Sequence, residues 1–183
     1  MTYSFKWFDS PLGTLKLIAS DAGLVAALWE GDYRYDRYLL PLVEAPEHSL
    51  LVQAEREFDE YFHADRKKFD IPLDFKGTAF QKSVWNALLA IPFGETGSYA
   101  DIAIEVGNPK AVLAVCSAAY RNPIAIIVPC HRVIGLYGAT GFTGGLKAKT
   151  HLLNVEGTGP KPKKKYDSQV GARIRKRAAQ PEA

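Results

Sequence analysis

The chain has 183 residues, 47% of them hydrophobic, which is enough apolar material for the core of one ordinary domain or two small ones. Its first ten residues, MTYSFKWFDS, lack an apolar leader, and no window is long enough to cross a bilayer. We therefore expect a cytoplasmic protein without membrane contact. Cys116 and Cys130 are the only cysteines and make a poor disulfide framework, so both are expected to be free thiols.

The net charge of +3 hides a gradient along the chain. Acidic residues exceed Lys and Arg by 14 to 8 in residues 1–75, whereas basic residues lead by 7 to 4 in 76–156 and by 8 to 2 in 157–183. A polyanion should therefore meet the C-terminal half. The basic segment 158–183 is expected to be mostly disordered, either as a solubilising tail or as a source of non-specific nucleic-acid affinity.

The N-terminal part predicts a small α/β unit of the α+β kind. Strands are expected at 3–9, 14–20 and 24–30, and the Gly and Pro residues between them favour an antiparallel meander. An amphipathic helix is expected over 50–64, and this unit should end near residue 76. The apolar positions expected on the buried face of the helix are Leu50, Ala54, Phe58, Tyr61 and Phe62.

From Thr78 onward the pattern becomes helical. Thr78 and Gln81 form a capping-box pattern that opens a helix over 79–91. Its expected buried positions are Phe80, Val84, Trp85, Leu88 and Leu89.

Two shorter helices follow. Ser98 is expected to cap a helix over 99–106, and Pro109 is placed at the first position of the next helix, over 109–120. Two short helices around a glycine turn suggest a helix-turn-helix, although many such pairs never touch DNA. The small residues of the second helix would allow either close approach to a DNA backbone or tight packing.

The segment VPCHRV places Cys130 directly after the apolar run 124–128, which predicts a buried strand. A nucleophilic cysteine needs a nearby cation, a base or a helix N-terminus to favour its thiolate, and His131 and Arg132 are candidates. Neighbouring side chains on an extended chain point in opposite directions, so His131 reaches Cys130 only if the chain turns there or a water bridges them.

A glycine-rich loop over 135–145 follows, without the lysine of a phosphate-binding loop. The last expected helix spans 146–157. Glu156 lies at its C-terminus, where the helix dipole disfavours an anion by some tenths of a kcal/mol. A carboxylate in that position suggests a functional role.

Taken together, the ordered motifs resemble the O-6-alkylguanine-DNA alkyltransferases over about residues 1–157. They are FQKSVWNAL, IPFGETGSYADIA, GNPKA, RNPIAIIVPCHRVIG, TGGLKAK and LLNVEG. The resemblance implies a ribonuclease-H-like domain at 1–76 and a helical DNA-binding domain with a helix-turn-helix at 77–157. It also implies a monomer without cofactor that acts once, on double-stranded DNA containing alkylated guanine.

The resemblance also implies residue roles. Cys130 would accept the alkyl group from a flipped base, His131 would act on it through a water, and Glu156 would orient His131. Tyr99 would donate toward the leaving guanine, and Asn122 would hold the turn near the cysteine. The implied DNA contacts are Ser98, Tyr99, Asn108, Lys110, Ala111, Leu113 and Arg121, and the implied guanine pocket is lined by Val133, Phe142 and Thr143.

Leu113 stands where the family usually carries an arginine that fills the space of the flipped base. Leucine can still wedge between bases, as apolar side chains do in other proteins that kink DNA. No metal site is expected, because His48, His63 and His151 are scattered without ligand spacing.

Three other functions compete with alkyl transfer. A damage-binding protein would bind alkylated DNA without reacting, and the presence of Cys130 argues against it. A transcription regulator with a redox-sensing thiol would bind selected sequences. A cysteine hydrolase would turn over repeatedly.

Overall fold

The computed structural model describes residues 2–35, 38–135 and 141–158, so the expected tail at 159–183 lies outside the described residues. The chain divides into two compact units. The first comprises residues up to Gly77 together with Pro123–Ile127, and the second comprises Thr78–Asn122 and the described residues from Val128 onward.

The first unit is built on a four-stranded sheet in the order β3-β2-β1-β4. The strands β1 (Tyr3–Ser10), β2 (Gly13–Ser20) and β3 (Gly23–Trp29) form the predicted antiparallel meander. The short strand β4 (Leu42–Glu44) was not predicted and runs parallel to β1, with Tyr3 opposite Leu42. Three residues give too short an alternation to be recognised in a sequence.

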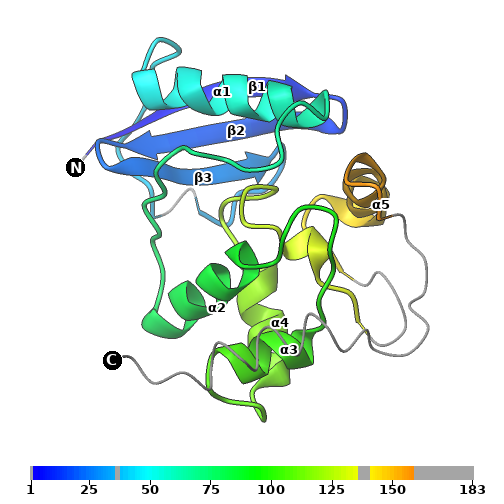
Figure 1. The fold of residues 1–183 in the computed structure, drawn as a ribbon. Coiled ribbons are helices and arrows are strands. Elements are labelled where there is room, and N and C mark those ends of the chain that lie inside the picture. Colours follow the sequence, from blue (N-terminus) through cyan, green and yellow to red (C-terminus); the bar gives the residue numbers. More distant parts are fainter. Residues whose placement is uncertain (1, 36–37, 136–140, 159–183) are drawn as a thin grey trace, which may run out of the picture. The chain divides into compact units, whose positions relative to one another are not determined.

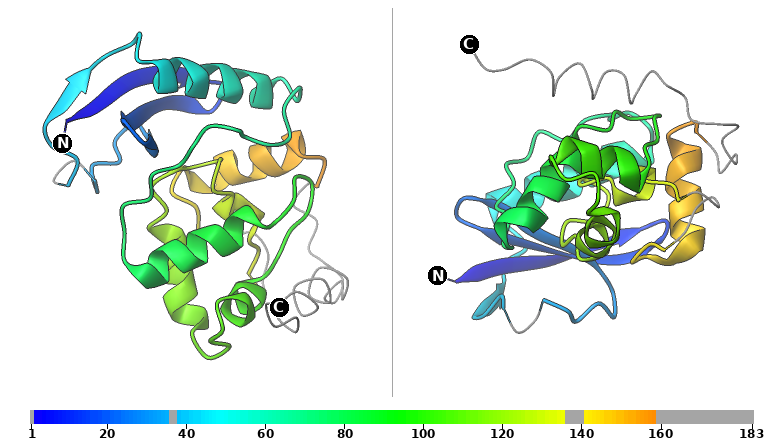
Figure 2. Two further views of the ribbon diagram at one scale, coloured as in Figure 1. Left: turned by 60° about the vertical axis from the view of Figure 1, so that its left-hand side comes forward. Right: turned by 90° about the horizontal axis from the view of Figure 1, so that it is seen from below.

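Helix α1 (Ser49–Phe62) lies across one face of this sheet (Figures 1 and 2). Phe58 stacks on Phe8 of β1 with 5.8 Å between ring centroids. The first residue of the predicted buried face was wrong by one position, because Leu51 is fully buried whereas Leu50 is half-buried. Positions 51, 54, 58 and 61 keep the helical spacing, and the ambiguity of two adjacent leucines caused the error.

The second unit contains the helices α2 (Ala79–Leu89), α3 (Tyr99–Glu105), α4 (Val112–Tyr120) and α5 (Gly145–Val155), together with the 3-10 turn η1 (Cys130–Arg132). The predicted capping box of α2 is confirmed, since Thr78 and Gln81 exchange side chain to backbone hydrogen bonds. The Nε1–H of Trp85 donates to the carbonyl of Ala118 at 2.9 Å and joins α2 to α4. Leu89 is 38% exposed, so its predicted place in the core was wrong.

Helix α3 begins at the predicted cap, because Ser98 and Asp101 form a second capping box. Helix α4 begins at Val112, three residues after the predicted start at Pro109. The amide of Ala111 donates to the carbonyl of Asn108 at 2.9 Å, so residues 108–111 form a turn with proline at its second position. Asn followed by Pro favours this turn, and Pro also favours a first helical position, so the two preferences compete here. The two helices that a helix-turn-helix requires are therefore present.

The apolar run 124–128 is buried, but the prediction of a strand there was wrong. Only Ile124 forms a bridge, to Ala27 of the first unit. The amide of Ile127 then donates to the carbonyl of Ala125 around Ile126, whose φ is 72°. A β-branched residue rarely takes this conformation, which makes a tight γ-turn and ends any strand. Sequence pattern detects burial in such a run but not the reversal of direction.

Candidate active site

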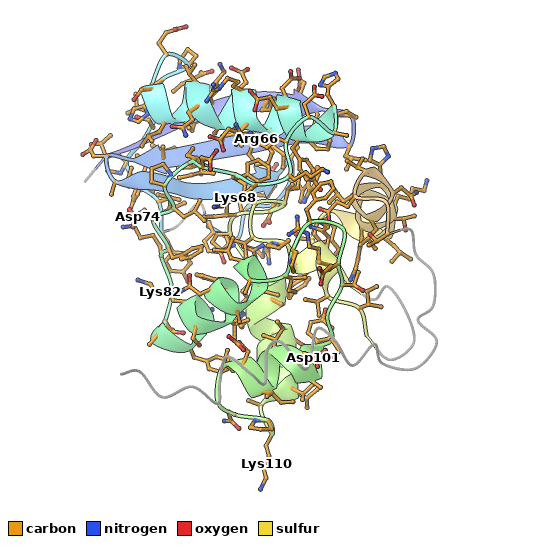
Figure 3. The ribbon with its side chains drawn as sticks, viewed as in Figure 1. Arg66, Lys68, Asp74, Lys82, Asp101 and Lys110 are labelled. Atoms are coloured by element: carbon orange, nitrogen blue, oxygen red, sulfur yellow. The ribbon has the colours of Figure 1, made fainter. Side chains whose placement is uncertain are left out.

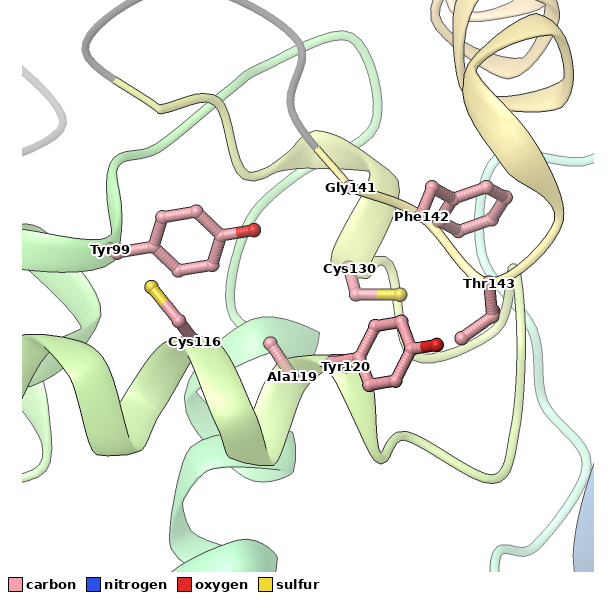
Figure 4. A pocket seen from close by; sticks show the side chains of 8 residues that line it. All are labelled: Tyr99, Cys116, Ala119, Tyr120, Cys130, Gly141, Phe142 and Thr143. Carbon is pink, nitrogen blue, oxygen red and sulfur yellow. The ribbon is translucent and has the colours of Figure 1, made fainter. Parts of the chain in front are cut away.

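The second unit contains a pocket of about 260 Å³ into which Cys130 opens (Figure 4). Helix α4 contributes three neighbours at helical spacing, Cys116, Ala119 and Tyr120. Tyr99, at the start of α3, lies close to Cys116, and the segment Gly141–Thr143 lines the pocket beside Cys130. Three aromatic rings and two thiols make the pocket largely apolar, which suits a flat, uncharged ring system.

Cys130 is held by a backbone hydrogen bond and by the side chain of Asn122. Its amide donates to the carbonyl of Val128 at 2.8 Å around Pro129, whose φ of −83° and ψ of 61° form an inverse γ-turn. The Nδ2 group of Asn122 donates to the same carbonyl at 2.8 Å and lies 3.4 Å from Sγ of Cys130. Asn122 therefore ties the end of α4 to the cysteine turn, as the sequence suggested, and contacts the thiol directly.

The chain turns at Cys130, and this turn allows the side chains of Cys130 and His131 to take part in one site. In a 3-10 turn successive side chains diverge by about 120°. Cys130 thus opens into the pocket, while His131 points to α5, where its Nε2 lies 2.7 Å from Oε1 of Glu156. A carboxylate only accepts, so Nε2 carries the proton and Nδ1 of the neutral ring is an acceptor. Burial lowers the pKa of His131, which keeps the ring neutral at neutral pH.

Glu156 caps α5, is buried and accepts a hydrogen bond from His131. It also accepts from Nε of Arg132 at 2.8 Å, Nη2 of Arg132 at 3.0 Å and the amide of Gly94 at 3.3 Å. Burial by itself raises the pKa of Glu156, but the hydrogen bonds from His131 and Arg132 and the charge of the Arg132 guanidinium outweigh it and lower the pKa to about 2. The helix dipole disfavours a carboxylate at this position, but the hydrogen bonds from His131, Arg132 and Gly94 stabilise it.

Two buried cations of this region were absent from the predicted site. Arg132 was considered only as a neighbour of the thiol, yet it pairs with Glu156. Lys149 is fully buried in α5 and donates to the carbonyl of Val133 at 2.7 Å. The misplaced carboxylate at the end of α5 was the available signal, because a buried anion needs a cation partner.

Tyr99 and Cys116, which also line the pocket, are held in their neutral forms. Burial, followed by the proximity of both thiols, raises the pKa of Tyr99 to about 12, so its hydroxyl keeps the proton it can donate. Burial also raises the pKa of the Cys116 thiol. Cys116 therefore lines the pocket as an uncharged wall and not as a second thiolate.

The other predicted residues lie either at the pocket or around helices α3 and α4. Phe142 and Thr143 line the pocket, whereas Val133 is buried beside it with its carbonyl bonded to Lys149. Around α3 and α4, Ser98 and Ala111 lie at the helix starts and are half-buried. The exposed candidates are Asn108, Lys110, Leu113 and Arg121. Lys110 projects from the turn between α3 and α4 (Figure 3).

Within the described ranges, no group of three or more His, Cys, Asp and Glu side chains is placed to hold a metal ion. The same residues include no helix long and apolar enough to cross a membrane.

Comparison with known proteins shows the family of the chain. Residues 79–158 match the family described as 6-O-methylguanine DNA methyltransferase, DNA binding domain, and residues 2–75 match its ribonuclease-like domain. A methylated-DNA–protein-cysteine methyltransferase of Methanosarcina acetivorans is 45% identical over 153 residues, which is 82% of this chain and 96% of that protein. The constitutive enzyme of Bacillus subtilis is also 45% identical, over 81% of this chain and 92% of its own.

Solved structures lead to the same family. A crystal structure of Mycobacterium tuberculosis OGT in complex with DNA is 40% identical, with a TM-score of 0.78 over 86% of this chain and 95% of that one. A structure of the O6-methylguanine methyltransferase of the same organism has a TM-score of 0.75 at 41% identity, over 85% of this chain and 93% of that one. The chain belongs to the 6-O-methylguanine DNA methyltransferase family. Its fold is accordingly a ribonuclease-like unit joined to a helical DNA-binding unit.

Proposed function

We propose that this protein repairs DNA by transferring the alkyl group of a 6-O-alkylguanine irreversibly to its own Cys130. The observation that carries the proposal is a cysteine that opens into an apolar pocket and is followed in sequence by a histidine bonded to a buried carboxylate. The names of the family and of its relatives supply the substrate. The cytoplasmic location expected from the sequence is part of the same proposal.

The reaction exchanges one bond for another. Sulfur attacks the alkyl carbon, the S–C bond forms, and the C–O bond to guanine breaks. The thiol proton passes to Nδ1 of His131 through one water, because Nδ1 is the acceptor nitrogen of the neutral ring. The imidazolium that results is stabilised by Glu156, which already accepts from the opposite ring nitrogen. General-base assistance of this kind is worth about 10²–10⁴-fold in rate.

The guanine leaves with negative charge that a hydrogen-bond donor must stabilise until solvent protonates it, and Tyr99 is the candidate. Its ring lines the pocket, and a pKa of about 12 keeps the hydroxyl protonated at neutral pH. A hydrogen bond from this hydroxyl would neutralise charge that develops on the guanine as the C–O bond breaks. The thioether product is stable, so one protein molecule performs one transfer and requires no cofactor.

A duplex hides the alkyl carbon, so the damaged nucleotide must leave the stack at a cost of a few kcal/mol. The exposed cations Lys110 and Arg121 flank α4 and suit the DNA backbone. Leu113, on the first turn of α4, is 85% exposed, which has no explanation in the packing of the free protein. We infer that Leu113 enters the stack in place of the flipped base.

The decisive test is to react the protein with duplex DNA carrying one 6-O-methylguanine and to locate the added mass by peptide mass spectrometry. We expect one methyl group on the Cys130 peptide, stoichiometric with protein and never more than one per chain. Tight binding without an added methyl would make the protein a damage sensor or a regulator. Repeated release of product would instead indicate a hydrolase.

Leu113→Ala is expected to leave the fold intact and to slow methyl transfer from duplex DNA about tenfold, the effect of losing roughly 1.4 kcal/mol of wedge contact. The free base 6-O-methylguanine needs no flipping, so its reaction should be unaffected. Leu89→Ala, which removes a partly exposed leucine at the end of α2, is the matched control. Equal loss with duplex and free base, or no faster reaction of Leu113→Arg, would argue against the wedge.

A further inference from the structure

Arg132 forms hydrogen bonds through Nε and both of its terminal nitrogens, and the mechanism above makes no use of it. It is buried, with 7% of its surface exposed. Its Nε and Nη2 groups donate to Oε2 and Oε1 of Glu156, which is the parallel, two-bond geometry that arginine forms best with a carboxylate. Its Nη1 group donates to the carbonyl of Ile91, just beyond α2, at 2.6 Å. The guanidinium also lies 5.9 Å from the ring centroid of Phe93.

These contacts fix the carboxylate on which His131 depends. A single hydrogen bond leaves a carboxylate free to rotate about its last torsion, whereas two parallel bonds define its plane. Oε1 of Glu156 receives both Arg132 and His131, so the arginine determines where the histidine finds its acceptor. Arg132 and His131 are neighbours in η1, and a short turn thus presents both side chains to one residue of α5.

The charge of Arg132 matters for His131 as well. A buried glutamate beside a histidine normally favours imidazolium, the form that cannot accept a proton from the thiol. Here the carboxylate is already neutralised by the guanidinium. The charged groups that act on His131 are Glu156 and Lys149 from α5 and Arg132 from η1. The uncharged ring of Phe142 lies edge-on to the imidazole, with 6.2 Å between the ring centroids. Lys149 and Arg132 lower the pKa of His131, whereas Glu156 raises it.

We propose that Arg132 is a positioning residue of the alkyl transfer: it orients the Glu156 carboxylate toward His131 and keeps His131 neutral, ready to accept the thiol proton. This inference rests on the proposed function for its kinetic consequence. Its electrostatic part concerns the resting protein and can be measured without any reaction.

Removing the cation should change the pH dependence and not only the rate. Burial is the main cause that lowers the pKa of His131, and the nearby charge of Arg132 lowers it as well. Arg132→Met raises that pKa, so more of the histidine is imidazolium at a given pH and the rate falls on the acid side. The acid limb is the pH range in which the single-turnover rate falls because His131 becomes protonated. We expect Arg132→Met to move this limb up by about one pH unit, a shift typical of one nearby charge. At a pH below the acid limbs of both proteins, the rate of the variant, divided by its rate at high pH, should then be about tenfold lower than the same ratio for the wild type.

The Arg132→Lys variant distinguishes the effect of the positive charge from the effect of orienting the Glu156 carboxylate. Lysine keeps the cation but loses the fork that binds both carboxylate oxygens. We expect its acid limb to move by less than half as much as that of Arg132→Met, with a lower plateau. Arg66→Met is the matched control, because Arg66 pairs with Glu60 and Asp70 in the first unit. Arg66→Met should lower the free energy of unfolding without moving the acid limb of the single-turnover rate.

The wild-type protein supplies a test that needs no variant to fold. ¹⁵N NMR of the histidine ring should show His131 neutral at pH 7 with its proton on Nε2, and Arg132→Met should move its titration to higher pH. An imidazolium at pH 7 in the wild type, or unmoved limbs in both Arg132 variants, would overturn the role of Arg132 alone. Absence of a methyl on wild-type Cys130 at every pH would instead overturn the proposed function.

Discussion

Cys130→Ser is expected to lower the rate of methyl transfer by more than about a thousandfold, the order of loss that follows removal of a catalytic nucleophile. A serine hydroxyl is a far weaker nucleophile at neutral pH, and His131 abstracts its proton less readily. Binding of damaged duplex should persist, because the exposed surface of α4 and the pocket walls are unchanged. Gel-shift titration measures the binding, and mass spectrometry of the protein measures the transfer.

Cys116→Ser is the matched comparison, since Cys116 is the other thiol of the same pocket. This variant should still acquire one methyl group, and that group should lie on Cys130. The raised pKa of the Cys116 thiol leaves almost no thiolate to compete. Transfer that survives in Cys130→Ser but disappears in Cys116→Ser would reverse the assignment.

Glu156→Gln should impair both stability and transfer. The amide keeps the shape of the side chain but removes the charge, so Arg132 is left buried without its anion. Breaking a buried pair in this way costs about 3–5 kcal/mol of unfolding free energy. His131 loses the partner that stabilises its protonated form, and we expect transfer to slow about a hundredfold. Denaturant unfolding and single-turnover kinetics measure the two effects.

The same carboxylate predicts how stability depends on pH. The pKa of Glu156 is about 2 in the folded protein, below its ordinary value of 4.5. A lowered folded pKa contributes stability that is complete above the unfolded pKa and is lost as pH falls toward the folded one. Wild-type protein should therefore lose this contribution between about pH 5 and pH 2. The Glu156→Gln variant should be flatter over that range, and an equal slope would show that other carboxylates dominate acid unfolding.

Periodicity and capping chemistry were enough to predict most local structure. The meander, the amphipathic α1 and the caps at Thr78 and Ser98 all depend on contacts between residues close in sequence. Errors arose where two local preferences competed. Asn108-Pro109 forms a turn in place of a helix start, and the apolar run 124–128 reverses direction at Ile126 in place of forming a strand.

By itself the sequence determined the family, the reactive cysteine and the residues expected to act on it, because ordered motifs are a property of the chain. Only the tertiary structure showed that Glu156 accepts from both His131 and Arg132, and that Lys149 is buried beside Val133. Those groups lie 16 to 25 positions apart in sequence, and their charges are tolerated in the interior only because folding brings the partners together. No local pattern encodes such pairing.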